Sequence, residues 1–173
     1  MKKIALLFGL GLGLLSCQNQ QKIAFVDNGK VINDYQAKID VEEKFKLKDL
    51  EFQKLRDSLI AKYQLEYKSA QDKARGMSDN DVQKLSQELG MKEQQLIQQI
   101  KMEQEQMTQE FQTEIDSVIV EVKEFVKEYG KKNDYTYILG TSEVAASVLY
   151  GKEDNDLTET ITEALNEAYK GKE

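Results

Sequence analysis

The sequence predicts an α+β fold that is mostly α, in which a small β-rich oligomerisation body carries one long antiparallel helical hairpin. The chain has 173 residues and no proline, and the absence of proline permits long, uninterrupted helices. Apolar residues recur in steps of three, four or seven through most of the chain, which is the spacing of a helix with one apolar face. Runs rich in β-branched and aromatic residues, typical of strands, occur only near the two ends.

At the N-terminus, residues 1–16 have the features of a signal peptide. Two lysines precede a 12-residue apolar run, Ile4–Leu15, which is too short to span a bilayer as a helix. Ser16 and Cys17 complete a stretch that resembles the lipobox of bacterial lipoproteins, in which the cysteine is lipidated and becomes the first residue. We therefore expect a lipoprotein signal peptide and a lipid anchor on Cys17. The alternative is an ordinary secretory leader with a cysteine near its cleavage site.

After the leader, residues 17–21 are predicted to be the lipidated N-terminus and a polar tether. An extended tether of this length reaches about 15 Å, at about 3.3 Å per residue, and would keep the rest of the chain close to the lipid. The next run, Lys22–Asp27, is mostly apolar, contains β-branched residues and ends at Asn28-Gly29, which is a turn signal. It is predicted to be a short buried strand.

The segment 31–131 is predicted to be a coiled-coil helical hairpin that begins at Val31. Each arm presents a narrow apolar stripe, suited to packing against one other helix. The reversal is expected at residues 76–79, because Gly76 suits a left-handed residue after a helix and Ser78 with the acidic residue three positions later resembles a capping box. The seam between the arms is predicted to contain the aromatic residues Phe45, Phe52, Tyr63 and Phe111.

After the hairpin, which is expected to end at Gly130, the chain returns to strand patterns and then ends in a helix. Tyr135–Thr141 and Ala146–Gly151 are rich in aromatic and β-branched residues. Asp156 is placed to cap a final helix that carries Glu159 near its start. Strands are therefore expected on both sides of the hairpin.

Because the reversal brings the two ends of the hairpin together, segments 22–30 and 132–173 are predicted to form one body. The strand near residue 25 can then pair with the two strands of the tail. A sheet of about three short strands exposes its edges and has little core. Self-association through the strands would cover the exposed edges and compensate for the small core, so we predict a homo-oligomer.

The composition excludes several kinds of site. The chain has no histidine and one cysteine, so it lacks the usual ligands of a zinc site and cannot form an internal disulfide. Its formal net charge of −7 argues against nucleic acid, whose phosphates would repel it. Asp154 and Asp156 are more simply a solvated loop and a helix cap than a metal or acid/base pair. We expect no enzyme activity and no cofactor.

Four features follow one another along the chain: the "KIAFVD" strand, the charged helical hairpin, "DYTYILGTSEVAASVLYG" and "DLTETITEAL". In this order they resemble the Skp/OmpH family of periplasmic chaperones, over about residues 22–170. The resemblance implies a homotrimer whose β-rich body bears three helical tentacles around a cavity for unfolded outer-membrane proteins. The chain differs from the soluble, basic members of the family in being acidic and in its expected lipid anchor. Carried over by position, the body would include Ile23, Phe25, Tyr137, Leu139, Val148 and Tyr150.

A chaperone that only holds its client needs dispersed apolar contacts and no catalytic group. The candidates are the apolar arm residues that remain once the hairpin seam is filled. The alternative for each of them is that it merely widens the seam. These candidate client-binding residues are Leu47, Leu50, Ile60, Leu65, Met77, Ile97 and Met102.

The expected function is that of an ATP-independent periplasmic holdase for unfolded outer-membrane proteins, tethered to a membrane by the N-terminal lipid. Gln18 follows the lipidated cysteine where well-studied lipoproteins retained in the inner membrane have an aspartate. This favours anchoring to the outer membrane of a Gram-negative bacterium. The alternative is a structural coiled-coil lipoprotein that serves as an envelope spacer or scaffold with fixed partners.

Overall fold

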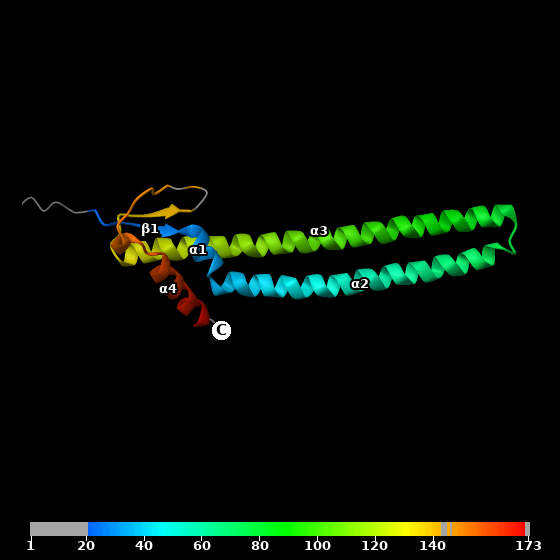
Figure 1. The fold of residues 1–173 in the computed structure, drawn as a ribbon, viewed down its shortest axis with the longest axis horizontal. Coiled ribbons are helices and arrows are strands. Elements are labelled where there is room, and N and C mark those ends of the chain that lie inside the picture. Colours follow the sequence, from blue (N-terminus) through cyan, green and yellow to red (C-terminus); the bar gives the residue numbers. More distant parts are fainter. Residues whose placement is uncertain (1–20, 143–144, 146, 172–173) are drawn as a thin grey trace, which may run out of the picture.

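The computed structural model describes residues 21–142, 145 and 147–171, and it shows a small body from which one long helical hairpin projects (Figure 1). This confirms the predicted fold class. The predicted leader, Cys17 and the tether up to residue 20 lie outside the described residues. In chain order the elements are β1 (Ile23–Asp27), α1 (Asn28–Asn33), α2 (Gln36–Ala74), α3 (Asp79–Lys132), β2 (Tyr137–Thr141), a short 3-10 turn (Glu153–Asn155) and α4 (Thr158–Lys170).

The sheet joins the two ends of the hairpin, as the sequence predicted. β1 and β2 are parallel, in a register that pairs Ile23 with Tyr137 and Asp27 with Thr141. The whole hairpin forms the connection between these two strands. The body is therefore closed by residues that lie more than a hundred positions apart.

The second strand predicted for the tail, 146–151, does not form in the described residues 145 and 147–151. The other edge of β1 is covered instead by the start of α4. There the backbone N–H of Leu157 donates to the carbonyl of Phe25 at 2.9 Å, and the backbone N–H of Asp27 donates to Thr158 Oγ1 at 2.9 Å. Asp156 caps this turn, since its carboxylate accepts from the backbone N–H of Thr158 at 2.9 Å.

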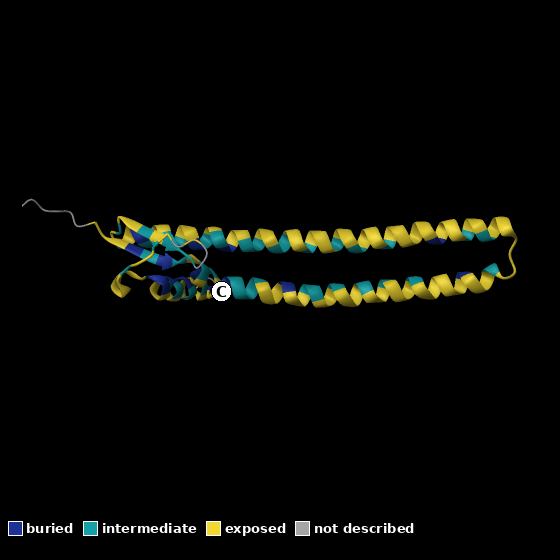
Figure 2. Cartoon of the chain, turned by 45° about the horizontal axis from the view of Figure 1, so that its top comes forward, coloured by how far each residue is buried: buried dark blue, intermediate teal, exposed yellow. Residues whose placement is uncertain are grey.

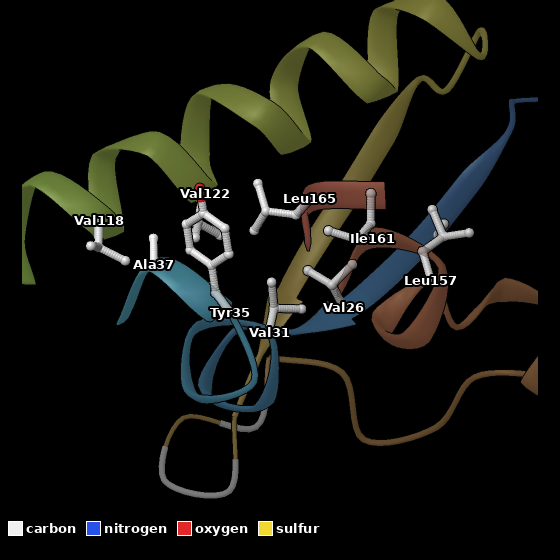
Figure 3. Close-up of a cluster of buried hydrophobic side chains, with 10 residues drawn as sticks. Val26, Val31, Tyr35, Ala37, Val118, Val122, Leu157, Ile161 and Leu165 are labelled. Carbon is white, nitrogen blue, oxygen red and sulfur yellow. The ribbon is translucent and has the colours of Figure 1, made fainter. Parts of the chain in front are cut away.

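A single hydrophobic core lies between one face of the sheet and the helices (Figure 3). Alternate residues of β1 point into it, so Ala24 and Val26 are buried while Ile23 is exposed. Helix α3 contributes two valines from its last turns, and α4 contributes its apolar stripe. The core consists of Ala24, Val26, Val31, Tyr35, Ala37, Val118, Val122, Leu157, Ile161 and Leu165.

The first arm is not one continuous helix from Val31, as the sequence predicted. The short helix α1 ends at Asn33, and α2 begins at Gln36 after an extended residue, Tyr35, with φ −76° and ψ 123°. Val31 and Tyr35 are both buried, with exposed fractions of 0% and 1%. The break therefore turns both side chains into the body, and α1 belongs to the body rather than to the arm.

The reversal at the tip lies where the sequence predicted it, between Ala74 and Asp79. The backbone of the reversal differs from the prediction in one respect. No described glycine has a positive φ, so Gly76 is not left-handed. Ser78 caps α3: its Oγ accepts from the backbone N–H of Asp81 at 3.3 Å and donates to the Asp81 carboxylate at 2.7 Å.

Helix α3 ends two residues later than predicted, and an aspartate takes the left-handed position. Asp134 has φ 56°, and the backbone N–H of Tyr135 returns to the carbonyl of Gly130 at 2.9 Å. This is the Schellman arrangement, which satisfies carbonyls at the end of a helix. The rings of Tyr129 and Tyr135 stack beside it, with centroids 6.3 Å apart.

Candidate functional site

The hairpin arm is held by a narrow aromatic and aliphatic seam. Near the body, Phe45 of α2 is 7% exposed and meets Phe111 of α3 edge to face, with ring centroids 5.2 Å apart. Near the tip, Ala70 and Leu89 are the buried pair. Away from these points the arm is largely exposed, whereas burial is concentrated in the body (Figure 2). The predicted seam residues Phe52, Tyr63 and Phe111 are half-buried.

Three ion pairs cross between the arms beside the seam. Lys44 Nζ lies 2.6 Å from the Glu114 carboxylate and Lys48 Nζ lies 2.8 Å from that of Glu110. Nearer the tip the polarity reverses, because Lys92 of α3 pairs with a glutamate, Glu66, of α2. The pairs fix which residues of the two helices face each other.

The electrostatics of the best-defined pair agree with its geometry. The hydrogen bond to Glu110 raises the pKa of Lys48, and the same bond lowers the pKa of Glu110, with a smaller contribution from Gln106. Both groups therefore stay charged near neutral pH. Exposed pairs of this kind are screened by salt and stabilise weakly.

The seam is not filled along its whole length. A hollow of about 450 Å³ lies between the arms, where its apolar wall comes from Phe52, Leu55 and Met107. A second hollow of about 230 Å³ lies near the tip, lined by Tyr63, Tyr67 and several small or aliphatic residues. The arm therefore offers open apolar surface within its seam as well as outside it.

All of the predicted client-binding residues are exposed. Leu47 and Leu65 are separated by about five helical turns, so they lie on one side of α2, roughly opposite the seam residue Phe45. Of the others, four are spread over the two helices and Met77 lies in the reversal between them, so the set forms no single continuous patch. Their exposed fractions range from 37% to 71% for Leu47, Leu50, Ile60, Leu65, Met77, Ile97 and Met102.

Further exposed apolar residues on the arms were not among the predicted candidates. Leu55 and Tyr67 have the helical spacing of the seam residues Phe52 and Tyr63, yet they are 47% and 44% exposed. Met91 and Val120 are also exposed. A residue-by-residue projection of α3, at about 100° per residue, would have placed both away from the seam.

The outer face of the sheet is a second apolar surface. Ile23 and Phe25 of β1 lie beside Tyr137 and Leu139 of β2 in the strand register, on the face opposite the core. All but the half-buried Phe25 are at least 42% exposed. In the segment that follows β2, Val148 is half-buried, while Leu149 and Tyr150 are 91% and 85% exposed. The predicted body residues thus lie on the outer side of the body, not in its core.

Within the described part of the chain, no group of three or more acidic, histidine or cysteine residues is placed to hold a metal ion. None of the helices described is long and apolar enough to cross a membrane.

The one large pKa shift in the described part of the chain belongs to Tyr35, which lies in the body core. Burial raises the pKa of Tyr35, and its hydrogen bond to Glu121 at 3.0 Å contributes further.

Comparisons with known proteins agree with one another. The model of the OmpH-like outer membrane protein family matches residues 22–165. Among solved structures, that of a proposed OmpH-like outer membrane chaperone from Caulobacter crescentus CB15 is similar, with 11% sequence identity, a TM-score of 0.74 and coverage of 86% of this chain and 85% of that one. At this identity the likeness shows the fold. The comparison with curated proteins finds no significant match.

Proposed function

The chain belongs to the OmpH-like family of outer membrane proteins, and on this premise we propose that it is a periplasmic holdase that binds unfolded outer-membrane β-barrel proteins without ATP. Membership in this family also confirms the prediction that the chain is not an enzyme. The resemblance to Skp/OmpH chaperones drawn from the terminal motifs is confirmed by the same match.

One observation carries the proposal: apolar side chains are exposed at many points along both arms, and no continuous patch collects them. Leu47, Leu65 and Met102 are each more than 60% exposed. Contacts of this kind are individually weak, so a client held by many of them can still leave without an energy source. The flexible thioethers of the methionines adapt to varied partners.

We also propose that the body assembles a homotrimer through the outer face of its sheet. In the described part of the chain β2 has β1 as its only neighbour, so its outer edge is open to a strand of another copy. Leu149 and Tyr150, almost fully exposed in one chain, would be covered in the assembly. The pattern that predicted a strand at 146–151 fits a segment whose partner is another copy.

A lipid on Cys17 would place this assembly at a membrane. The described body begins at residue 21, only a few residues beyond that cysteine. The tether then holds the body within about 15 Å of the lipid. We propose a periplasmic location at the outer membrane of a Gram-negative bacterium.

The proposal is tested by light scattering from a denatured outer-membrane β-barrel protein diluted into buffer with or without the chain. The chain should suppress aggregation, and a variant with Leu47→Gln, Leu65→Gln and Met102→Gln should do so less well. The matched control replaces three exposed lysines on the same helices, Lys46→Gln, Lys62→Gln and Lys101→Gln, and should remain active. Full activity of the apolar-to-polar variant would contradict the proposed contacts.

The alternative function, an envelope spacer or scaffold, predicts a different set of partners. Photo-crosslinkers placed at Leu65 and Met102 in intact cells should capture many different β-barrel proteins if the chain is a holdase. One dominant crosslinked partner, together with no suppression of aggregation, would support the scaffold instead.

A further inference from the structure

The two arms of the hairpin are attached to the body in different ways. Helix α3 runs without interruption from the tip into the body, where Val118 and Val122 are buried in the core. Helix α2 is joined to the body through the extended residue Tyr35 and the six-residue helix α1, and only its start, at Ala37, is buried in the core. The direction in which α2 leaves the body therefore depends on this backbone break, whereas the Phe45–Phe111 contact and the Lys44–Glu114 pair hold α2 to α3 farther along the arm.

That break leaves several backbone groups without their helical partners, among them the N–H of Gln36 and the carbonyl of Asp34. In a continuous helix the N–H of Gln36 would donate to Ile32, and the carbonyl of Asp34 would accept from Lys38. In the structure the N–H of Lys38 donates to the carbonyl of Tyr35 at 3.0 Å, and the side chain of Tyr35 caps nothing. The break costs both hydrogen bonds unless another group supplies them.

Asn166 of α4 supplies both. Its Oδ1 accepts from the backbone N–H of Gln36 at 2.8 Å, and its Nδ2 donates to the carbonyl of Asp34 at 3.0 Å. One side-chain amide thus caps the start of α2 and satisfies the carbonyl before the break. The residue lies about 130 positions away along the chain.

A second contact from the next turn of α4 holds the same place. The hydroxyl of Tyr169 donates to the Asp40 carboxylate at 2.9 Å, and Asp40 also accepts from Gln36 Nε2 at 2.7 Å. The ring of Tyr169 meets that of Tyr35 edge to face, with centroids 5.7 Å apart. Helix α4 is itself fixed by Ile161 and Leu165, which are buried in the core.

We propose that α4 is a clasp that seats the root of α2 against α3, with Asn166 and Tyr169 as its positioning residues. When the clasp is released, Tyr35 can take helical angles, α1 and α2 can join, and the root of α2 separates from α3. Helix α3 stays in place because its own turns carry it into the core. The release would widen the apolar seam near the body, where Phe45 and Phe111 meet. The inference concerns the geometry of the arm and stands apart from the proposed holdase activity.

Two pairs of spin labels, placed in the full chain carrying Cys17→Ser, measure the separation of α2 and α3 near the clasp and far from it. The root pair, Glu43→Cys with Ser117→Cys, reports the separation of α2 and α3 near the body. The tip pair, Lys62→Cys with Gln95→Cys, reports the same helices far from the clasp; all four positions are exposed. Labelled chain is diluted with unlabelled chain, so that distances between copies do not contribute.

Asn166→Ala should lengthen and broaden the root distance while the tip distance stays as in the parent. Tyr169→Phe removes the hydroxyl that donates to Asp40 and keeps the ring, so it should lengthen the root distance to a smaller extent. It provides a second test if Asn166→Ala unfolds the body. The matched control is the exposed neighbour Glu167→Ala, which should leave both distances unchanged. An unchanged root distance in both clasp variants would overturn the proposal.

A rescue variant separates the clasp from a general loss of stability. Proline is favoured at the first position of a helix and holds the preceding residue extended, so Gln36→Pro should keep Tyr35 in its observed conformation without help from α4. Adding Gln36→Pro to Asn166→Ala should return the root distance to that of the parent. A double variant whose root pair stays long would show that Asn166 does not act through the break.

Discussion

Asp134 holds the one left-handed backbone conformation found at a non-glycine residue in the described part of the chain, with φ 56°. An L-residue pays about 1–2 kcal/mol there, and glycine avoids this but loses about 0.5–1 kcal/mol through the flexibility of the unfolded chain. Asp134→Gly should therefore stabilise the protein by roughly 0.5–1 kcal/mol, measured by urea unfolding. A β-branched residue is strained in this region, so Asp134→Val should destabilise it.

The same substitution inside α3 provides the control for Asp134. Asp116 lies in the exposed interior of the helix, where glycine costs about 0.5–1 kcal/mol relative to residues that favour helix. Asp116→Gly should therefore lower stability. If both glycine variants lower it, the left-handed conformation at Asp134 is not a source of strain.

Gly151 lies against an aromatic ring of the body. A Cβ added there would lie 2.3 Å from Cε1 of Phe25, so Gly151→Ala must displace the ring and should destabilise the protein by about 1–3 kcal/mol. Gly90, inside α3, has open space around it, and Gly90→Ala should stabilise by roughly 0.5–1 kcal/mol. Thermal unfolding should show a lower midpoint for Gly151→Ala and a higher midpoint for Gly90→Ala. Equal changes in the two midpoints would contradict the packing of Gly151 on Phe25.

At the scale of residues, the sequence predicted which side chains lie outside the seam better than it predicted the core. Spacing separated Leu47 and Leu65 from Phe45, because helical periodicity depends only on local geometry. In β1 the alternation of Ile23 and Phe25 with Ala24 and Val26 defines two faces but not which one is covered. The chosen body residues are on the outer face, and the core face became known only from the position of α4.

At the scale of elements, local signals identified both arms, the reversal and the final helix. The break before α2 carries only the turn-prone pair Asn33-Asp34 as a local signal, and neither proline nor glycine lies within five residues of Tyr35. It is stabilised by burial of Tyr35 and by Asn166, which are long-range effects. The opposite case is the strand predicted at 146–151, which is not found in the described residues 147–151. The pattern of this segment suits a strand, but the edge of β1 with which it would pair is already occupied by the start of α4.

The ion pairs between the arms set the register of the hairpin, and a charge exchange tests this. Lys48→Glu places like charges opposite Glu110 and near Glu114, so it should lower the thermal midpoint and loosen the arm. Glu110→Lys added to that variant should restore most of the loss. The control Lys46→Glu changes the same charge at an exposed position for which no ion pair is found in the described part of the chain, and should have a smaller effect. A double variant no better than Lys48→Glu would contradict the pairing.

At the scale of the whole molecule, the charge of the chain limits how it can hold a client. The formal net charge is −7, so we do not expect the proposed assembly to have a generally positive cavity that attracts acidic segments. Apolar contact must then provide most of the binding, and it is strengthened rather than screened by salt. Suppression of aggregation should therefore persist when sodium chloride is raised to about 0.5 M, where the Debye length falls to a few ångströms. Loss of suppression at that salt would indicate capture by charge.

The assembly is tested at the surface that one chain leaves uncovered. Leu149 and Tyr150 are 91% and 85% exposed beside the apolar outer face of the sheet, and two large apolar side chains so exposed indicate a surface that is covered in the functional state. Leu149→Ser with Tyr150→Ser should convert the proposed trimer to smaller species in multi-angle light scattering. Far-ultraviolet circular dichroism should change little, because most helical residues lie in the arms and not at this surface.

The neighbouring exposed pair Lys152 and Glu153 provides the control for this assembly test. Lys152→Ser with Glu153→Ser alters the same loop without removing apolar area, so the trimer should remain. A parent chain that is already monomeric at micromolar concentration would refute assembly through this face. A trimer that survives the loss of Leu149 and Tyr150 would place the interface elsewhere, with the open edge of β2 as the remaining surface to change.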